Sequence, residues 1–170
     1  MKLSVRIGAL AVALAAGSAV VVPLAIPAGA AVKPSVVCSK IAATTTIKGA
    51  NGTTATAWSS CTPAALAAGG SSSVTVPVSK LLGNLTSTIT WKGGKGTTIV
   101  TLKYTTQKTK TGCPAGTAYR TIITGTTKAS TGAAKAVLKV GETITAEVCT
   151  TITTTTKYTS KLKPGTKFKI

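Results

Sequence analysis

Threonine constrains the fold of this chain more than any other residue. The 170 residues include 34 Thr, all of them after residue 43. Thr, Val and Ile favour strands because their branched side chains pack well on a pleated surface. Strict alternation supports this, since residues 73–78 place Val74, Val76 and Val78 on one face. The sequence therefore predicts an all-β chain.

The clearest predicted unit is a hairpin between residues 85 and 106. Its loop, Gly93-Gly94-Lys95-Gly96, supplies the positive backbone dihedral angles that a short reversal needs. Alternation assigns one face of the hairpin to the core. The inward side chains are predicted to be Leu85, Ser87, Ile89, Trp91, Val100, Leu102 and Tyr104.

Further strands are predicted between turn signals rich in Gly, Pro, Asn and Ser. Their regular spacing favours a single antiparallel β-sandwich, immunoglobulin-like, or a partly open barrel, with two disulfides. In one of these strands, Ala134, Ala136, Leu138 and Val140 are expected to face the core. The predicted ranges are 35–41, 43–49, 53–60, 118–126, 133–140, 142–150, 151–159 and 165–170.

The first thirty residues are typical of a secretory signal peptide. Lys2 and Arg6 precede an apolar run that continues to Ile26, and Ala28-Gly29-Ala30 supplies a small-residue cleavage site. We expect residues 1–30 to be removed on export and residues 31–170 to form one domain. The mature protein is then extracellular or associated with the cell wall.

Four cysteines follow the predicted signal peptide: Cys38, Cys61, Cys113 and Cys149. An even number in an exported chain predicts two disulfides, for which three pairings can be drawn. Cys38 to Cys61 and Cys113 to Cys149 are favoured because each closes a local loop. In its strand Cys149 shares a side with Glu147, so its bridge is expected outside the sheet unless the register shifts.

The exported chain is strongly basic. Loss of Lys2 and Arg6 changes the formal net charge from +18 to +16, carried almost entirely by Lys. Such a surface attracts polyanions in a salt-dependent way, although solubility explains the charge equally well. The candidate polyanion-binding residues are Lys92, Lys95, Lys103, Lys135 and Lys139.

Residue types that carry acid–base chemistry are scarce. The chain has no His and no Asp, and the two acids, Glu142 and Glu147, are an odd number of residues apart in one strand. We therefore predict no enzyme, no catalytic residue, no metal site and no cofactor. Ser160 and Lys163 match a motif of acyl-transfer enzymes, but a Lys- and Ser-rich chain produces such matches by chance. Specific nucleic-acid binding is not predicted either, because the tyrosines lack a recognisable spacing among the lysines.

Several segments resemble small secreted four-cysteine proteins of high-GC Gram-positive bacteria, a group with no known activity. The resemblance rests on cysteines, turns and core aromatic residues, and implies a β-sandwich without assigning functional residues. In composition the chain also resembles, more distantly, the enediyne-carrier proteins, which are secreted immunoglobulin-like sandwiches with two disulfides. The segments are Cys38-Ser39-Lys40-Ile41, Trp58-Ser59-Ser60-Cys61, Ile89 to Lys95, Cys113-Pro114-Ala115-Gly116 and Leu162 to Thr166.

The sequence thus predicts a secreted, non-catalytic β protein held by its lysines on anionic cell-wall polymers such as teichoic acids. The alternatives are a protease inhibitor and a carrier of a small ligand. A large apolar pocket would favour the carrier.

Overall fold

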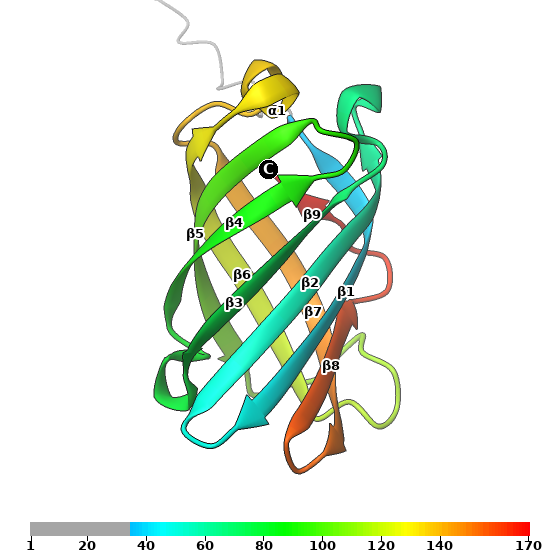
Figure 1. Cartoon of the computed structure of the whole chain (residues 1–170). Coiled ribbons are helices and arrows are strands. Elements are labelled where there is room, and N and C mark those ends of the chain that lie inside the picture. Colours follow the sequence, from blue (N-terminus) through cyan, green and yellow to red (C-terminus); the bar gives the residue numbers. More distant parts are fainter. Residues whose placement is uncertain (1–34) are drawn as a thin grey trace, which may run out of the picture. The chain divides into compact units, whose positions relative to one another are not determined.

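The computed structural model describes residues 35–170, so the predicted signal peptide lies outside the described residues. Long antiparallel strands dominate this part of the chain (Figure 1). The strands are β1 (Val37–Lys48), β2 (Asn51–Thr62), β3 (Gly70–Pro77), β4 (Asn84–Trp91), β5 (Gly96–Gln107), β6 (Tyr119–Ser130), β7 (Thr143–Thr154), β8 (Lys157–Leu162) and β9 (Phe168–Lys169). The short helical segments are η1 (Ala64–Leu66), η2 (Val78–Lys80) and α1 (Gly132–Val137).

The first eight strands form a closed barrel. Each pairs with the next along the chain, and β8 returns to pair with β1 from Ala42↔Lys161 to Thr46↔Lys157. The all-β prediction is confirmed; of its two architectures, the sandwich is not found, and the barrel is found in a closed rather than partly open form. One continuous sheet that meets its own first strand replaces two stacked sheets, and closure leaves far fewer unpaired strand edges.

The eighth position of the barrel is shared by two strands. β8 lies between β1 and β7 along half of their length, and the two-residue β9 occupies the same position further along. Residues 163–167 leave the wall between them. The strand predicted over 165–170 is therefore only this short β9.

The predicted hairpin of residues 85–106 is confirmed. Inward and outward positions alternate without exception in β4, and Thr98, Val100 and Leu102 are buried on β5. Gly93, Gly94 and Gly96 have positive φ in the connecting turn.

The strand predicted over 133–140 is wrong, because the chain forms α1 there. Ala134 and Leu138 are buried and Ala136 and Val140 are exposed, which is the i, i+4 spacing of a helix and not the alternation of a strand. The segment is rich in Ala, the best helix former. The backbone N–H of Ala134 donates to the Lys95 carbonyl (2.9 Å), which holds α1 against the β4–β5 turn.

Two other strand boundaries differ from the prediction. The ranges 35–41 and 43–49 are one continuous strand, β1, and β7 extends to Thr154 before the chain turns into β8. Because Thr occurs at both inward and outward positions of a strand, Thr-rich sequence does not indicate where one strand ends and the next begins.

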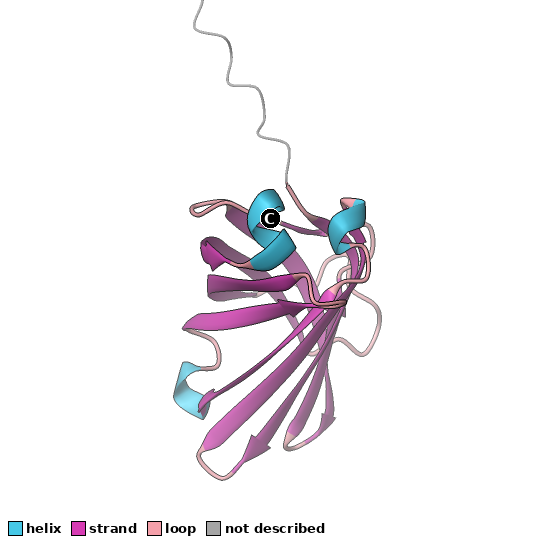
Figure 2. Cartoon of the chain, turned by 45° about the horizontal axis from the view of Figure 1, so that its top comes forward, coloured by secondary structure: helices cyan, strands magenta, loops and turns pink. Residues whose placement is uncertain are grey.

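The two ends of the barrel differ (Figures 1 and 2). We call the end that carries α1, η1 and the β4–β5 turn the closed end. The opposite end, with the β1–β2 and β7–β8 turns, η2 and the β5–β6 loop, is the open end. Large buried side chains fill the interior towards the closed end, among them Leu66, Trp91, Leu138, Ile144 and Ile170.

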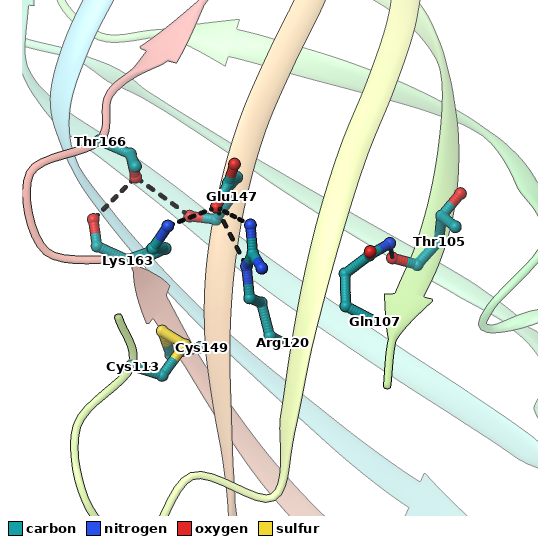
Figure 3. A network of polar contacts seen from close by, with 8 residues as sticks. All are labelled: Thr105, Gln107, Cys113, Arg120, Glu147, Cys149, Lys163 and Thr166. Carbon is teal, nitrogen blue, oxygen red and sulfur yellow. Dashed lines mark hydrogen bonds and ion pairs between the residues drawn. A yellow bond between two sulfur atoms is a disulfide. The ribbon is translucent and has the colours of Figure 1, made fainter. Parts of the chain in front are cut away.

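Both favoured disulfide pairings are confirmed. Cys38–Cys61 joins residues directly opposite each other in β1 and β2, and Cys113–Cys149 ties the β5–β6 loop to β7. Cys149 lies in the part of β7 whose outward side chains include Glu147, as the sequence predicted, and the loop covers it (Figure 3). Two disulfides are consistent with an extracellular protein.

Candidate functional site

The barrel encloses a cavity of about 420 Å³ in its open half. At its inner end lie Trp58 and Phe168, whose ring centroids are 5.6 Å apart. At its outer end lie Val78, Leu82 and Tyr119, which are 40%, 66% and 45% exposed. Because residues that line the cavity are also in contact with solvent there, the cavity opens at the open end of the barrel.

The cavity exists because many of the inward side chains in the open half are small. An eight-stranded barrel has a radius set by its strand number, so it encloses either large side chains or space for one small ligand. The closed half is filled by Trp, Leu and Ile side chains, whereas Ala, Ser and Thr occupy ten of the 25 positions that line the cavity in the open half. The small lining residues are Ala43, Thr45, Thr54, Thr56, Ser72, Ser87, Thr106, Thr121, Thr150 and Ser160.

Hydroxyl groups of the wall bond to each other in neighbouring strands. Thr45 and Thr54 share a hydrogen bond of 2.9 Å, and Thr150 and Ser160 share one of 2.7 Å. These pairs satisfy four hydroxyl groups within the wall, and aliphatic side chains make up much of the rest, so the cavity is largely apolar. The aliphatic lining side chains are Ile41, Ile47, Val74, Val78, Leu81, Leu82, Leu85, Leu102, Ile123 and Val148.

Two buried polar atoms of the cavity wall have no partner. Trp58 Nε1 and Ser87 Oγ are unbonded although the two residues are only 4% and 7% exposed. In contrast, Trp91 Nε1 in the closed half donates to Thr98 Oγ1 at 2.9 Å. An unsatisfied buried polar group costs about 1–3 kcal/mol. Both atoms are covered by neighbouring atoms, so a ligand oxygen in the cavity would bond to them only after the covering side chains moved.

Tyr104 also lines the cavity and reports on its polarity. Burial raises the pKa of the Tyr104 phenol to about 12 because the wall disfavours the charged phenolate. The side chain is therefore neutral at physiological pH. An interior of this kind favours neutral, apolar molecules over ions.

The wall of the barrel is least complete between β3 and β4. These strands pair only at Gly70↔Trp91 and Ser71↔Thr90, near the closed end, and separate towards the open end. The β3–β4 connection, with η2, Leu81 and Leu82, lies at this seam. The mouth of the cavity is thus bordered by a segment that is not held in the sheet on both sides.

The five candidate polyanion-binding lysines do not form one patch. Lys92 and Lys95 lie at the β4–β5 turn, Lys135 on α1 and Lys139 just after it, so these four are at the closed end. Lys103 lies opposite Asn84 in the β4–β5 pair, towards the open end. All five are exposed.

The motif residues Ser160 and Lys163 are not brought together for catalysis. The Ser160 hydroxyl is paired with Thr150 on the cavity side. Lys163 Nζ instead donates to Glu147 Oε2 at 3.0 Å, on the side of the wall where Arg120 also lies (Figure 3).

Glu147 binds the start of the segment that links β8 to β9 in the eighth position of the barrel (Figure 3). Its Oε2 accepts from Lys163 Nζ and from Arg120 Nε (3.1 Å) and Nη2 (2.8 Å), and its carbonyl accepts from the Lys163 N–H (2.8 Å). The hydrogen bonds from Lys163 and Arg120 hold the pKa of Glu147 below its usual range. The glutamate thus joins β6, β7 and the segment that links β8 to β9.

No protein family, curated protein or solved structure matches this chain. In residues 35–170 no helix has the length and hydropathy needed to cross a membrane.

Sequence reasoning missed the cavity residues. The available signal was the size of the inward side chains, because the inward series of β1 includes the small residues Ala43 and Thr45 between Ile41 and Ile47. That series is informative only once the strands are known to enclose a barrel.

Proposed function

We propose that this protein is a secreted, non-catalytic carrier that binds one small, neutral, apolar molecule inside the barrel. The observation that carries the proposal is the open, largely apolar cavity, whose lining residues Trp58 and Ser87 each have a covered polar atom without a partner, Nε1 and Oγ. Its volume of about 420 Å³ falls within the range typical of small-molecule sites.

The unsatisfied groups also narrow the class of ligand. The indole N–H can only donate a hydrogen bond, and the serine hydroxyl can donate or accept one. A ligand with a carbonyl, ether or hydroxyl oxygen could satisfy them once the side chains that cover the two atoms move aside. We therefore propose a mostly apolar ligand with one such oxygen.

Prodan, a naphthalene probe with a single ketone, tests this proposal. We expect saturable one-site binding with a blue-shifted emission, and about tenfold weaker binding of 2-dimethylaminonaphthalene, which lacks the ketone. Trp58→Phe keeps an aromatic ring at the inner end of the cavity but removes the N–H donor. It should weaken prodan binding about tenfold and leave the affinity of the ketone-free probe unchanged.

Two outcomes would contradict the proposal. One is non-saturable binding of both probes to the wild type. The other is an equal effect of Trp58→Phe on both probes, which would mean that the N–H does not contact the ketone.

A second function, retention on anionic cell-wall polymers, is supported by the four exposed lysines at the closed end. Lys92, Lys95, Lys135 and Lys139 lie on adjoining segments there, and neither α1 nor the β4–β5 turn contains an acidic residue. This arrangement concentrates positive charge on one end of the molecule.

Retention on immobilised teichoic acid tests this second function. We expect the triple variant Lys92→Glu, Lys95→Glu, Lys135→Glu to elute at clearly lower salt than a control with three reversals elsewhere, Lys103→Glu, Lys161→Glu, Lys167→Glu. Equal elution of the two variants would show that only the net charge matters.

A further inference from the structure

The open end carries most of the large apolar side chains that the structure leaves exposed. Six such residues occur within residues 35–170, and four of them are Val78, Leu82, Tyr119 and Ile152. Val78, Leu82 and Tyr119, on the β3–β4 connection and at the start of β6, line the cavity at its mouth, and Ile152 lies near the end of β7 at the same end of the barrel. Exposed apolar side chains that gather at one end mark an interaction surface.

Lysines accompany these apolar residues on the same segments, and carboxylates do not. Within the described residues the only acids are Glu142, which precedes β7 at the closed end, and Glu147, which is paired with Arg120 and Lys163. The surface around the mouth therefore combines apolar groups with charge of one sign. The exposed lysines on the open-end segments are Lys48, Lys80, Lys108, Lys110 and Lys157.

From this arrangement we propose that the open end docks on an anionic lipid bilayer. Apolar side chains on separate connections can enter the headgroup region together, while lysines around them contact anionic headgroups. An anionic bilayer complements both features at once. Docking would place the cavity mouth against the hydrocarbon phase, where apolar molecules dissolve; this last step rests on the proposed carrier function.

The orientation of docking is tested with tryptophan at two exposed positions. Leu82→Trp places an indole at the mouth, and Val140→Trp places one at the closed end, where Val140 is 72% exposed. With vesicles of phosphatidylcholine and phosphatidylglycerol brominated on their acyl chains, we expect quenching of the tryptophan at 82 and not of that at 140. Both variants share the same N-terminal segment and the buried Trp58 and Trp91, so these contributions cancel.

A charge-matched pair of double variants separates docking from diffuse attraction. Lys80→Glu with Lys157→Glu changes the open end, and Lys92→Glu with Lys135→Glu makes the same change in net charge at the closed end. We expect the open-end double variant to weaken vesicle binding at least about tenfold and the closed-end double variant to weaken it by much less.

Three results would each overturn the docking proposal. They are equal quenching of the tryptophans at 82 and 140, equal effects of the two double charge reversals, and no binding of the wild type to anionic vesicles. Prodan binding is measured without lipid, so failure of docking is distinguishable from failure of the carrier function. Loss of prodan binding with docking intact would overturn only the carrier.

Discussion

Replacing Ala43 by Trp is expected to weaken prodan binding about 100-fold. Ala43 is an inward residue of β1 that lines the cavity. An indole at this position would occupy space that the probe needs, and binding would require its displacement from an apolar site at a cost of about 3 kcal/mol. A cavity of about 420 Å³ can accept the new ring, so the fold should persist.

The neighbouring residue supplies a matched control. Ala42 is exposed on the other face of the same strand, opposite Ala57 of β2 and Lys161 of β8. Ala42→Trp adds the same side chain to the outside of the barrel and should leave the prodan dissociation constant within about twofold of the wild type. If the two variants reduce binding equally, prodan is not bound inside the barrel. Circular dichroism would establish that both remain folded.

Replacing Glu147 by Gln is expected to lower the free energy of unfolding by about 1–2 kcal/mol at neutral pH. The amide keeps the shape of the side chain but loses the charge that faces Arg120 and Lys163. These side chains are partly exposed, so solvent screens part of the loss. Chemical denaturation of the two proteins measures the difference.

The effect of Glu147→Gln should depend on pH in a defined direction. Because the folded pKa of Glu147 lies below its ordinary value of 4.5, its contribution to stability is complete above that value. The contribution is lost as the pH falls through the folded pKa, so wild type and variant should converge in acid. Glu142→Gln, whose carboxylate makes no ion pair within the described residues, should destabilise less at neutral pH. A difference between wild type and Glu147→Gln that grows in acid would contradict this account.

Local features of the fold could be predicted from the sequence. The alternation in β4 identified each inward residue from Leu85 to Trp91, because one face of the strand is buried and the other is not. Both disulfide pairings followed from the preference for local loops. The position of Cys149 on the outside followed from its parity with Glu147.

The closure of the barrel could not be predicted in this way. Pairing of β8 with β1 joins residues more than a hundred positions apart, and the alternation within either strand is the same in a sandwich and in a barrel. The helix α1 was missed for a local reason. In Ala133-Ala134-Lys135-Ala136, small side chains fit both a strand and a helix, and the contact with the Lys95 carbonyl decides between them.

The candidate site depends on this closure. Small inward residues such as Ala43 and Thr45 indicate a lightly filled interior. A cavity forms from them only because the strands close into a barrel around that interior. The unbonded Trp58 Nε1 and Ser87 Oγ lie on β2 and β4, which are not neighbours in the sheet. That Trp58 and Ser87 line one cavity becomes visible only in three dimensions.

A crystal structure of the protein with prodan bound tests the central claim most directly. The account predicts electron density for the probe inside the open half of the barrel, with the ketone oxygen at hydrogen-bond distance from Trp58 Nε1 or Ser87 Oγ. Density for the probe only on the outer surface, or a barrel interior occupied by rearranged side chains that leave no room for it, would contradict the account.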